Sequence, residues 1–215
     1  MRHDIYRRPH KAVRAMMAGS LTALQSADPG DECDMRDALA QLEEMLAFCE
    51  AHAALESAFV HREIEARSPG SACFLATEHA AQEREIEALR TLARERHPDL
   101  HRHLALFIAD NLRHMEDEET RGNALLWAHF SDAEIVAIER RLVASKPPGE
   151  TMQALRWMLP ALNHRERVAL MAGLRAAPPA MLAAALGVAR THLQPRDAAR
   201  LEESLRDDKT TGVPA

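Results

Sequence analysis

The sequence contains few aromatic residues and no strand-like pattern. Aromatic side chains make up 4% of its 215 residues. No segment alternates Val, Ile, Thr or Tyr with polar residues, which is the pattern of a half-buried β-strand. Residues that favour helices, such as Ala, Leu, Glu and Arg, dominate instead. We therefore expect an all-α protein.

Long apolar runs and an excess of one charge are also absent. No stretch approaches the roughly 20 apolar residues of a membrane-spanning helix, and residues 1–20 lack the continuous apolar segment of a secretory signal. The formal net charge is -6, with Lys and Arg scattered among acidic residues. Such a distribution gives no electrostatic footprint for nucleic acid. We expect a cytoplasmic protein that binds neither nucleic acid nor a membrane.

Cysteine is scarce and has no metal-binding spacing. The three cysteines, Cys33, Cys49 and Cys73, are odd in number and form no CxxC motif. This argues against both a disulfide framework and a zinc ribbon. We expect three free thiols.

Loop-forming residues divide the first 130 residues into four long helical segments. The apolar periodicity and the breakers predict helices at about residues 4–27, 34–67, 71–97 and 98–130. The loops between them are short, so consecutive helices should pack as antiparallel neighbours. The predicted architecture is an antiparallel up-down four-helix bundle with a small C-terminal helical extension.

The clearest linker follows a predicted fifth helix. Ser131 and Asp132 resemble a cap for a helix that reaches residue 145, and Pro147, Pro148 and Gly149 then interrupt the chain. We predict one domain at residues 1–146, a C-terminal helical extension at 149–206, and a disordered tail at 207–215. Three or four short helices are expected in the extension, at about 150–162, 164–176, 180–192 and 195–205.

The second, third and fourth helices each carry a histidine followed four residues later by glutamate. These pairs are His52 with Glu56, His79 with Glu83, and His114 with Glu118. Residues i and i+4 of an α-helix lie on the same face, one turn apart. Each pair therefore presents an imidazole and a carboxylate in the same direction, which is a spacing typical of metal ligands.

The pairs lie on the apolar faces of their helices. At about 100° per residue, His52 and Glu56 share a direction with Met45, and His114 and Glu118 share one with Phe107. Polar pairs on buried faces cost several kcal/mol unless they are partnered. A cation between the helices would resolve this conflict.

His10 in the first helix supplies a fourth imidazole. At roughly 1.5 Å per residue, His10 and His52 reach similar heights in an antiparallel pair, and so do His79 and His114. The second and third helices match less well, by several residues. Several carboxylates with imidazoles suit iron better than structural zinc. Two ions are the natural count, because a carboxylate can bridge them.

In this arrangement Glu56 and Glu118 touch both ions. His10 and His52 then hold one ion, and His79 and His114 hold the other. Glu83 has an alternative interpretation as a solvated surface carboxylate, because the residues around it are highly charged.

These residues resemble the hemerythrin-like family, also called the cation-binding domain with a His-His-Glu signature. The resemblance covers about residues 3–130 and is carried by residues 4–11, by His52 to Glu56 with Phe59 following, by residues 78–79 and by residues 114–119. It implies two non-haem iron ions with an oxo or hydroxo bridge. It also implies a small diatomic or peroxide ligand, and a role in sensing O2, NO or peroxide or in iron and oxidative-stress handling.

The chain departs from the oxygen-carrying hemerythrins in two places. Those relatives use five histidines and two bridging carboxylates. Here Glu83 replaces a histidine expected four residues after His79, and Glu118 follows His114 by four residues instead of five. These departures favour the bacterial and iron-sensing branch over reversible oxygen carriage. No residue is assigned a catalytic role, and enzyme activity is left open.

Other interpretations remain at this point. One is a regulatory or scaffold module with a structural metal centre, whose C-terminal helices bind a protein partner or form a homodimer. A ferritin-like di-iron oxidase fits less well, since that class uses Glu-x-x-His spacing. The other histidines are predicted to be exposed or capping residues: His3, His61, His97, His101, His103, His129, His164 and His192. Tyr6 is expected to fill the core, to hydrogen-bond near the site or to guard its entrance.

Overall fold

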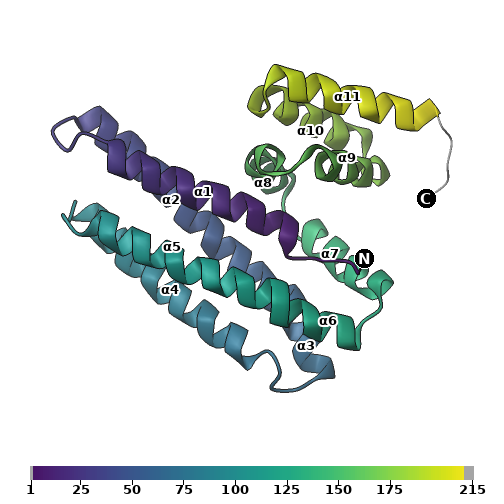
Figure 1. Cartoon of the computed structure of the whole chain (residues 1–215), viewed down its shortest axis with the longest axis horizontal. Coiled ribbons are helices and arrows are strands. Elements are labelled where there is room, and N and C mark those ends of the chain that lie inside the picture. The colour runs from purple at the N-terminus through teal and green to yellow at the C-terminus, as the bar shows by residue number, and fades with distance from the viewer. Residues whose placement is uncertain (1, 211–215) are drawn as a thin grey trace. The chain divides into compact units, whose positions relative to one another are not determined.

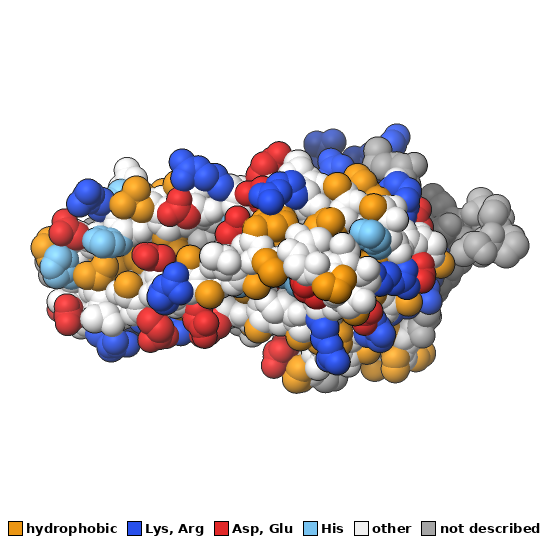
Figure 2. Space-filling view, turned by 90° about the horizontal axis from the view of Figure 1, so that it is seen from below, with side chains coloured by type: hydrophobic (Ala, Val, Ile, Leu, Met, Phe, Trp, Pro, Cys, Tyr) orange, Lys and Arg blue, Asp and Glu red, His pale blue; other side chains and the backbone are white. Residues whose placement is uncertain are grey.

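The protein is helical throughout its described residues. The computed structural model describes residues 2–210, and every regular element in this range is a helix. The predicted all-α class is confirmed. None of the described helices combines the length and the apolar character needed to cross a membrane. On the face shown in Figure 2, acidic and basic side chains lie among one another, as they do along the sequence.

Four long helices build the N-terminal part of the chain. They are α1 (Arg7–Ser26), α2 (Glu32–Glu56), α4 (Cys73–Arg94) and α5 (Leu100–Asp117). Helix α1 packs against α2 and α5, and α4 packs against the same two helices. Figure 1 shows the four lying side by side. The space enclosed between them holds the buried residues of all four.

Local signals account for where these helices begin and which face they bury. The side chain of Asp31 accepts hydrogen bonds from the backbone N–H groups of Cys33 and Asp34, which caps α2. Helix α1 buries Val13, Met16 and Met17 along one stripe. Ser131 and Glu134 form a capping box at the start of α7 (Asp132–Ala144).

Two of the predicted helices contain an interruption that their periodicity does not reveal. After α2, the chain forms a π-helical segment, Ser57–His61, before continuing as α3 (Arg62–Arg67). After α5, a second π-helical segment, Glu118–Gly122, precedes α6 (Asn123–His129). A π-helical turn takes up one residue more than an α-helical turn. Residues beyond Glu56 and Glu118 are therefore rotated relative to an unbroken α-helix.

An apolar core lies at the end of the four helices where α3, α6 and α7 meet the N-terminal segment. It includes Ile5, Val60, Ile64, Leu126 and Ile135, each at most 6% exposed. Hydrogen bonds from the side chain of Arg2 to the carbonyl of Phe130, and from Trp127 to the carbonyl of His3, tie the N-terminal segment to this core. The segment before α1 is thereby held next to the helices.

The chain separates into two compact units, Met1–Ser145 and Lys146–Ala215. The second unit contains α8 (Pro148–Ala161), α9 (His164–Gly173), a 3-10 turn (Leu174–Ala176), α10 (Pro179–His192) and α11 (Pro195–Thr210). Helix α9 therefore ends earlier than the predicted helix at 164–176. Helix α11 continues past residue 206 into the segment predicted to be a disordered tail, and residues 211–215 lie outside the described part.

The second unit has a core of its own. Leu155, Leu159, Met171 and Leu201 are each at most 3% exposed and belong to one apolar cluster. The buried guanidinium of Arg167 donates hydrogen bonds to the backbone carbonyl of Leu159 and elsewhere in the unit. The unit therefore buries an apolar core made of its own residues.

Candidate metal centre

Ionisable side chains gather in the space between the four long helices. His10 and Glu118 are each 0% exposed, Glu56 is 3% exposed and His79 is 8% exposed. His10 lies near the start of α1, Glu56 ends α2, and Glu118 begins the π-helical segment after α5. Groups of this kind are rarely buried unless they pair with one another or bind a metal.

One group of donor atoms joins α1 and α2. It consists of His10, His52 and Glu56, whose donor atoms lie within 4.8 Å of one another. The Oε1 atom of Glu56 is 3.5 Å from Nε2 of His10 and 3.2 Å from Nε2 of His52. Two helices thus supply two imidazoles and a carboxylate to one point.

A second group adds α4 and the end of α5. It consists of Glu56, His79, His114 and Glu118, again within 4.8 Å of one another. The two Nε2 atoms of His79 and His114 are 2.9 Å apart. Glu118 approaches both rings, with Oε1 3.5 Å from Nε2 of His79 and Oε2 3.4 Å from Nε2 of His114.

The two glutamates connect these groups. Glu56 belongs to both of them, and Oε2 of Glu118 is 3.1 Å from Nε2 of His10 in the first group. Donors that share one metal ion at about 2.0–2.2 Å lie roughly 2.9–3.4 Å apart. The separations given above, from 2.9 to 3.5 Å, lie in or near this range, so these donors could hold a metal ion.

Several of these atoms have no hydrogen-bond partner despite their close approach. They include Nε2 of His10, Oε2 of Glu56 and both carboxylate oxygens of Glu118. The atoms are near one another but not aligned as donor and acceptor. An unsatisfied buried polar group costs about 1–3 kcal/mol, and more when it is charged. Cations held at this place would satisfy all of these atoms.

Three of the imidazoles are held at their other nitrogen by an outer partner. Nδ1 of His10 is 2.9 Å from Oε1 of Glu119, and Nδ1 of His114 is 2.8 Å from Oε2 of Glu78. Nδ1 of His79 is 2.8 Å from Oγ of Ser57. When Nδ1–H is donated outward, Nε2 keeps its lone pair inside, which is the tautomer that binds a metal.

The charges of the cluster shift the pKa values of its members. Burial disfavours a charged His10, but the carboxylates of Glu118, Glu119 and Glu56 outweigh burial and raise its pKa well above the usual value. Burial likewise disfavours a charged Glu118, but His10, His61 and His79 outweigh it and hold the pKa of this carboxyl well below the usual value. A proton on His10 thus balances the carboxylates, and a binding cation would have to displace this proton.

Glu83 lies outside both groups. The structure brings together six of the seven residues proposed from the sequence, whereas Glu83 is exposed on α4. A step of four residues turns an α-helical direction by about 40°. Since His79 already borders the solvent, this turn carries Glu83 out of the interior.

His61 is a member of the cluster that α-helical spacing does not reveal. It was expected to be exposed or capping, but it is 5% exposed, and its Nε2 atom is 3.1 Å from Oε1 of Glu118. On an unbroken α-helix, His61 would point about 140° away from Glu56. The π-helical segment between them brings it back to the interior. Only a sequence signal for the π-helical turn would have predicted this position.

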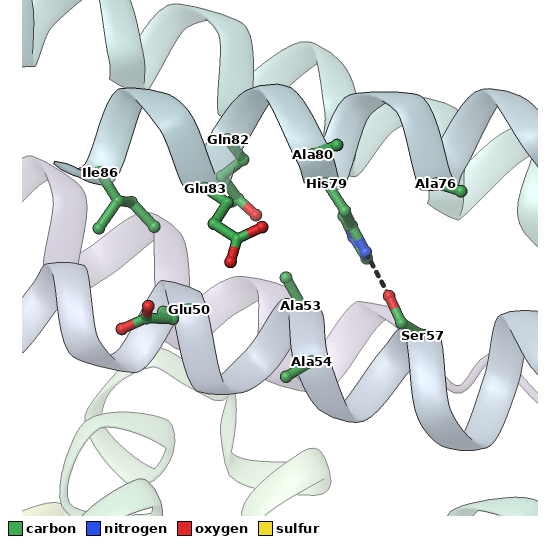
Figure 3. A pocket seen from close by; sticks show the side chains of 10 residues that line it. All are labelled: Glu50, Ala53, Ala54, Ser57, Ala76, His79, Ala80, Gln82, Glu83 and Ile86. Carbon is green, nitrogen blue, oxygen red and sulfur yellow. Dashed lines mark hydrogen bonds between the residues drawn. The ribbon is translucent and has the colours of Figure 1, made fainter. Parts of the chain in front are cut away.

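Two cavities approach the cluster from the solvent. One of about 310 Å³ lies between α2 and α4, and it is lined by Ala53, Ala80, Glu83 and the His79–Ser57 pair (Figure 3). Another of about 350 Å³ lies between α4 and α5 and reaches His114. The cluster is therefore closest to solvent at these two imidazoles and fully enclosed at His10 and Glu118.

No family model matches the chain, and no curated protein or solved structure matches it. The family resemblance therefore depends on the residues quoted for it above and on their geometry.

Proposed function

We propose that the N-terminal unit is a hemerythrin-like, antiparallel up-down four-helix bundle that holds two non-haem iron ions. In this proposal the protein binds or senses O2, NO or peroxide, or takes part in iron and oxidative-stress handling. The observation that supports it is the meeting of buried imidazoles and two carboxylates from four helices, with facing atoms that lack hydrogen bonds.

Six residues would hold the iron in this centre. His10 and His52 would bind one ion, His79 and His114 the other, and Glu56 and Glu118 would supply carboxylates to both. Iron supplies an exchangeable coordination position and reversible redox chemistry when it is bound. The packed helices hold the ligand side chains in place. They also exclude bulk water from His10 and Glu118, which are each 0% exposed.

The donor chemistry favours iron over structural zinc. Zinc sites that serve structure use four ligands and often thiolates. The buried cysteine of the first unit is Cys49, and burial raises the pKa of its thiol to about 12. Among the described residues, neither donor group includes a cysteine, so the centre offers only nitrogen and oxygen donors.

The test is the metal content of the purified full chain after anaerobic loading with Fe(II). We expect about two iron ions per chain. The matched variants are Glu118→Gln and Glu83→Gln, which remove the same charge inside and outside the centre. Glu118→Gln should bind less than one ion and Glu83→Gln about two. The proposal fails if the wild-type chain binds no metal, or if the two variants lose metal equally.

A second candidate function follows from the separate core of the second unit. In it, the metal centre is structural and α8 to α11 present a surface for a partner, which is either another protein or a second copy of this chain. The optical spectrum of the iron-loaded protein distinguishes the two. A spectrum that changes when O2 or NO is added supports the first function, and one that does not respond supports the second.

A further inference from the structure

The phenol of Tyr6 is buried without a hydrogen-bond partner. Tyr6 is the only tyrosine of the sequence, it is 1% exposed, and its hydroxyl oxygen bonds to no described residue. Buried tyrosine hydroxyls usually find a partner. Buried side-chain atoms without a hydrogen-bond partner also occur in the candidate centre, at His10, Glu56 and Glu118, and at both ring nitrogens of His61. The Tyr6 hydroxyl thus shares its lack of a partner with proposed ligand atoms.

The ring of Tyr6 lies directly against the cluster. It stacks on the imidazole of His10, with ring centroids 5.7 Å apart and an angle of 28° between the planes. It also meets the ring of His61, at 6.3 Å between centroids. Tyr6 precedes His10 by one helical turn, and the backbone N–H of His10 donates to the Tyr6 carbonyl. The phenol is thus held in a fixed position beside a proposed ligand.

Gly122 provides the space that the hydroxyl occupies. A Cβ atom at this position would lie 3.2 Å from the hydroxyl oxygen of Tyr6 and 3.2 Å from its Cε2 atom. The backbone of Gly122 has an ordinary helical φ of −60°, so the glycine is needed for room and not for its conformation. Gly122 ends the π-helical segment that Glu118 begins. The hydroxyl therefore lies one turn from a bridging carboxylate.

The phenol of Tyr6 carries its proton at neutral pH, as tyrosine side chains ordinarily do. The carboxylates of Glu118 and Glu56 are not aligned to accept the phenol proton, because the hydroxyl and both oxygens of Glu118 are unpartnered. A protonated donor next to the centre is left for an acceptor that comes from outside the chain.

We infer that the Tyr6 hydroxyl donates a hydrogen bond to a small ligand bound at the metal centre beside Glu118. The ligand class is an anion or polar molecule of two or three heavy atoms with an exposed lone pair. Larger molecules do not fit, because Tyr6, His10 and Glu118 are at most 1% exposed. Tyr6 acts in this way only if the proposed metal centre is present.

The test uses azide as the probe on the iron-loaded full chain. Tyr6→Phe keeps the ring and removes only the hydroxyl, so the metal content should stay at the wild-type value. The dissociation constant for azide, measured by optical titration, should rise about ten- to hundredfold, the loss expected for one hydrogen bond to a charged acceptor. Ser20→Ala is the control: it removes a fully buried hydroxyl of α1, the helix that Tyr6 precedes, and it should leave azide affinity unchanged.

A second readout does not depend on affinity. Isotope-labelled tyrosine marks a single residue, so the phenol C–O stretching band in an infrared difference spectrum reports Tyr6 alone. The band should shift when azide is added to the iron-loaded protein and stay unchanged when azide is added to the metal-free protein.

The outcomes separate this inference from the proposed function. Metal content is measured first, and a wild-type chain without metal overturns both. A metal-loaded wild type that binds no azide, or a Tyr6→Phe variant with wild-type azide affinity, overturns the role of Tyr6 and leaves the metal centre standing. Loss of metal in Tyr6→Phe also overturns it, because Tyr6 would then help to hold the cations.

Discussion

At the scale of single residues, the outer partners of the imidazoles decide which nitrogen faces the centre. Glu119 pairs with Nδ1 of His10 through its Oε1 atom. The same oxygen accepts a hydrogen bond of 2.8 Å from Nη1 of Arg14. Glu78 pairs with Nδ1 of His114. Such partners fix the tautomer and the orientation of a ligating ring, and they raise its basicity. The charge of Glu119 therefore acts on the centre through His10.

We predict that Glu119→Gln lowers metal affinity about tenfold or more without changing the number of ions bound at saturation. An amide can still accept the proton of His10, but it no longer stabilises positive charge on the ring. Competition with a chelator of known affinity measures the effect. Glu116→Gln is the control, since Glu116 is an exposed carboxylate of α5, three residues before Glu119 in the chain. Equal affinities for the two variants would contradict the prediction.

The raised and lowered pKa values predict how the metal-free protein responds to pH. The pKa values of His10 and His79 are raised above 6.5, so the stability that these residues contribute is complete below pH 6.5 and is lost as pH rises through the raised values. The pKa values of Glu56 and Glu118 are lowered from 4.5, so their contribution is present above pH 4.5 and is lost in more acidic solution. The cluster should therefore stabilise the metal-free protein most between pH 4.5 and 6.5.

Denaturation by urea at about pH 6 and pH 9 measures this difference. The free energy of unfolding of the metal-free protein should be lower at pH 9. The metal-bound protein should show the opposite trend in metal affinity, because protons compete with the cations for the imidazoles. If the metal-free protein instead gains stability from pH 6 to pH 9, the carboxylates do not raise the pKa values of His10 and His79, and the prediction is wrong.

At the scale of elements, the two π-helical segments are part of the centre. One follows Glu56 directly and ends at His61, and the other begins at Glu118 and ends at Gly122. π-helical turns inside α-helices occur frequently at functional sites. Here the first brings His61 inward and the second places a glycine against the phenol of Tyr6.

We predict that Gly122→Ala destabilises the first unit by about 1–3 kcal/mol, because the new methyl group overlaps the ring and hydroxyl of Tyr6. Gly19→Ala is the matched control within a helix of the same unit. Its Cβ atom would meet only the end of the flexible Gln41 side chain, at 3.1 Å, so this change should be neutral or stabilising by up to about 1 kcal/mol. Chemical denaturation measures the free energy of unfolding of both variants. Equal values would show that there is room for a Cβ atom between Gly122 and Tyr6.

At the scale of the whole molecule, the chain consists of two units that each have an apolar core. Every residue of the candidate centre belongs to the first unit. Metal binding and the integrity of the second unit should therefore be separable.

We predict that a chain ending at Ser145 binds as much iron as the full chain. In the full chain, Leu159→Ala should destabilise the second unit by about 2–5 kcal/mol, because Leu159 is 0% exposed in its core, and it should leave the iron content unchanged. Calorimetry measures the change in stability, and metal analysis measures the iron content of both proteins. A shortened chain that folds but binds no iron would show that residues 146–215 contribute to the centre.

Much of the secondary structure was predictable because its signals are local. Ser131 caps α7 through a neighbour three residues away, and Pro98, near the start of α5, restricts the backbone next to it. The spacing of His52 and Glu56, and of His114 and Glu118, indicated one shared face per pair because four residues make about one helical turn. The same rule misplaced Glu83 and missed His61, since it holds only for an uninterrupted α-helix on a buried face.

By itself, the sequence determined the helical class, the approximate helix bounds, and the shared face of His52 with Glu56 and of His114 with Glu118, because all of these follow from contacts within a few residues. The meeting of these residues with His10 and His79 was a prediction that only the packing of the helices could decide. Only the tertiary structure decided the π-helical turns, the exposure of Glu83 and the outer partners. Glu119 is 109 residues from His10, and Glu78 is 36 residues from His114. Such pairs depend on how whole helices pack against one another, and no periodicity along a single helix encodes them.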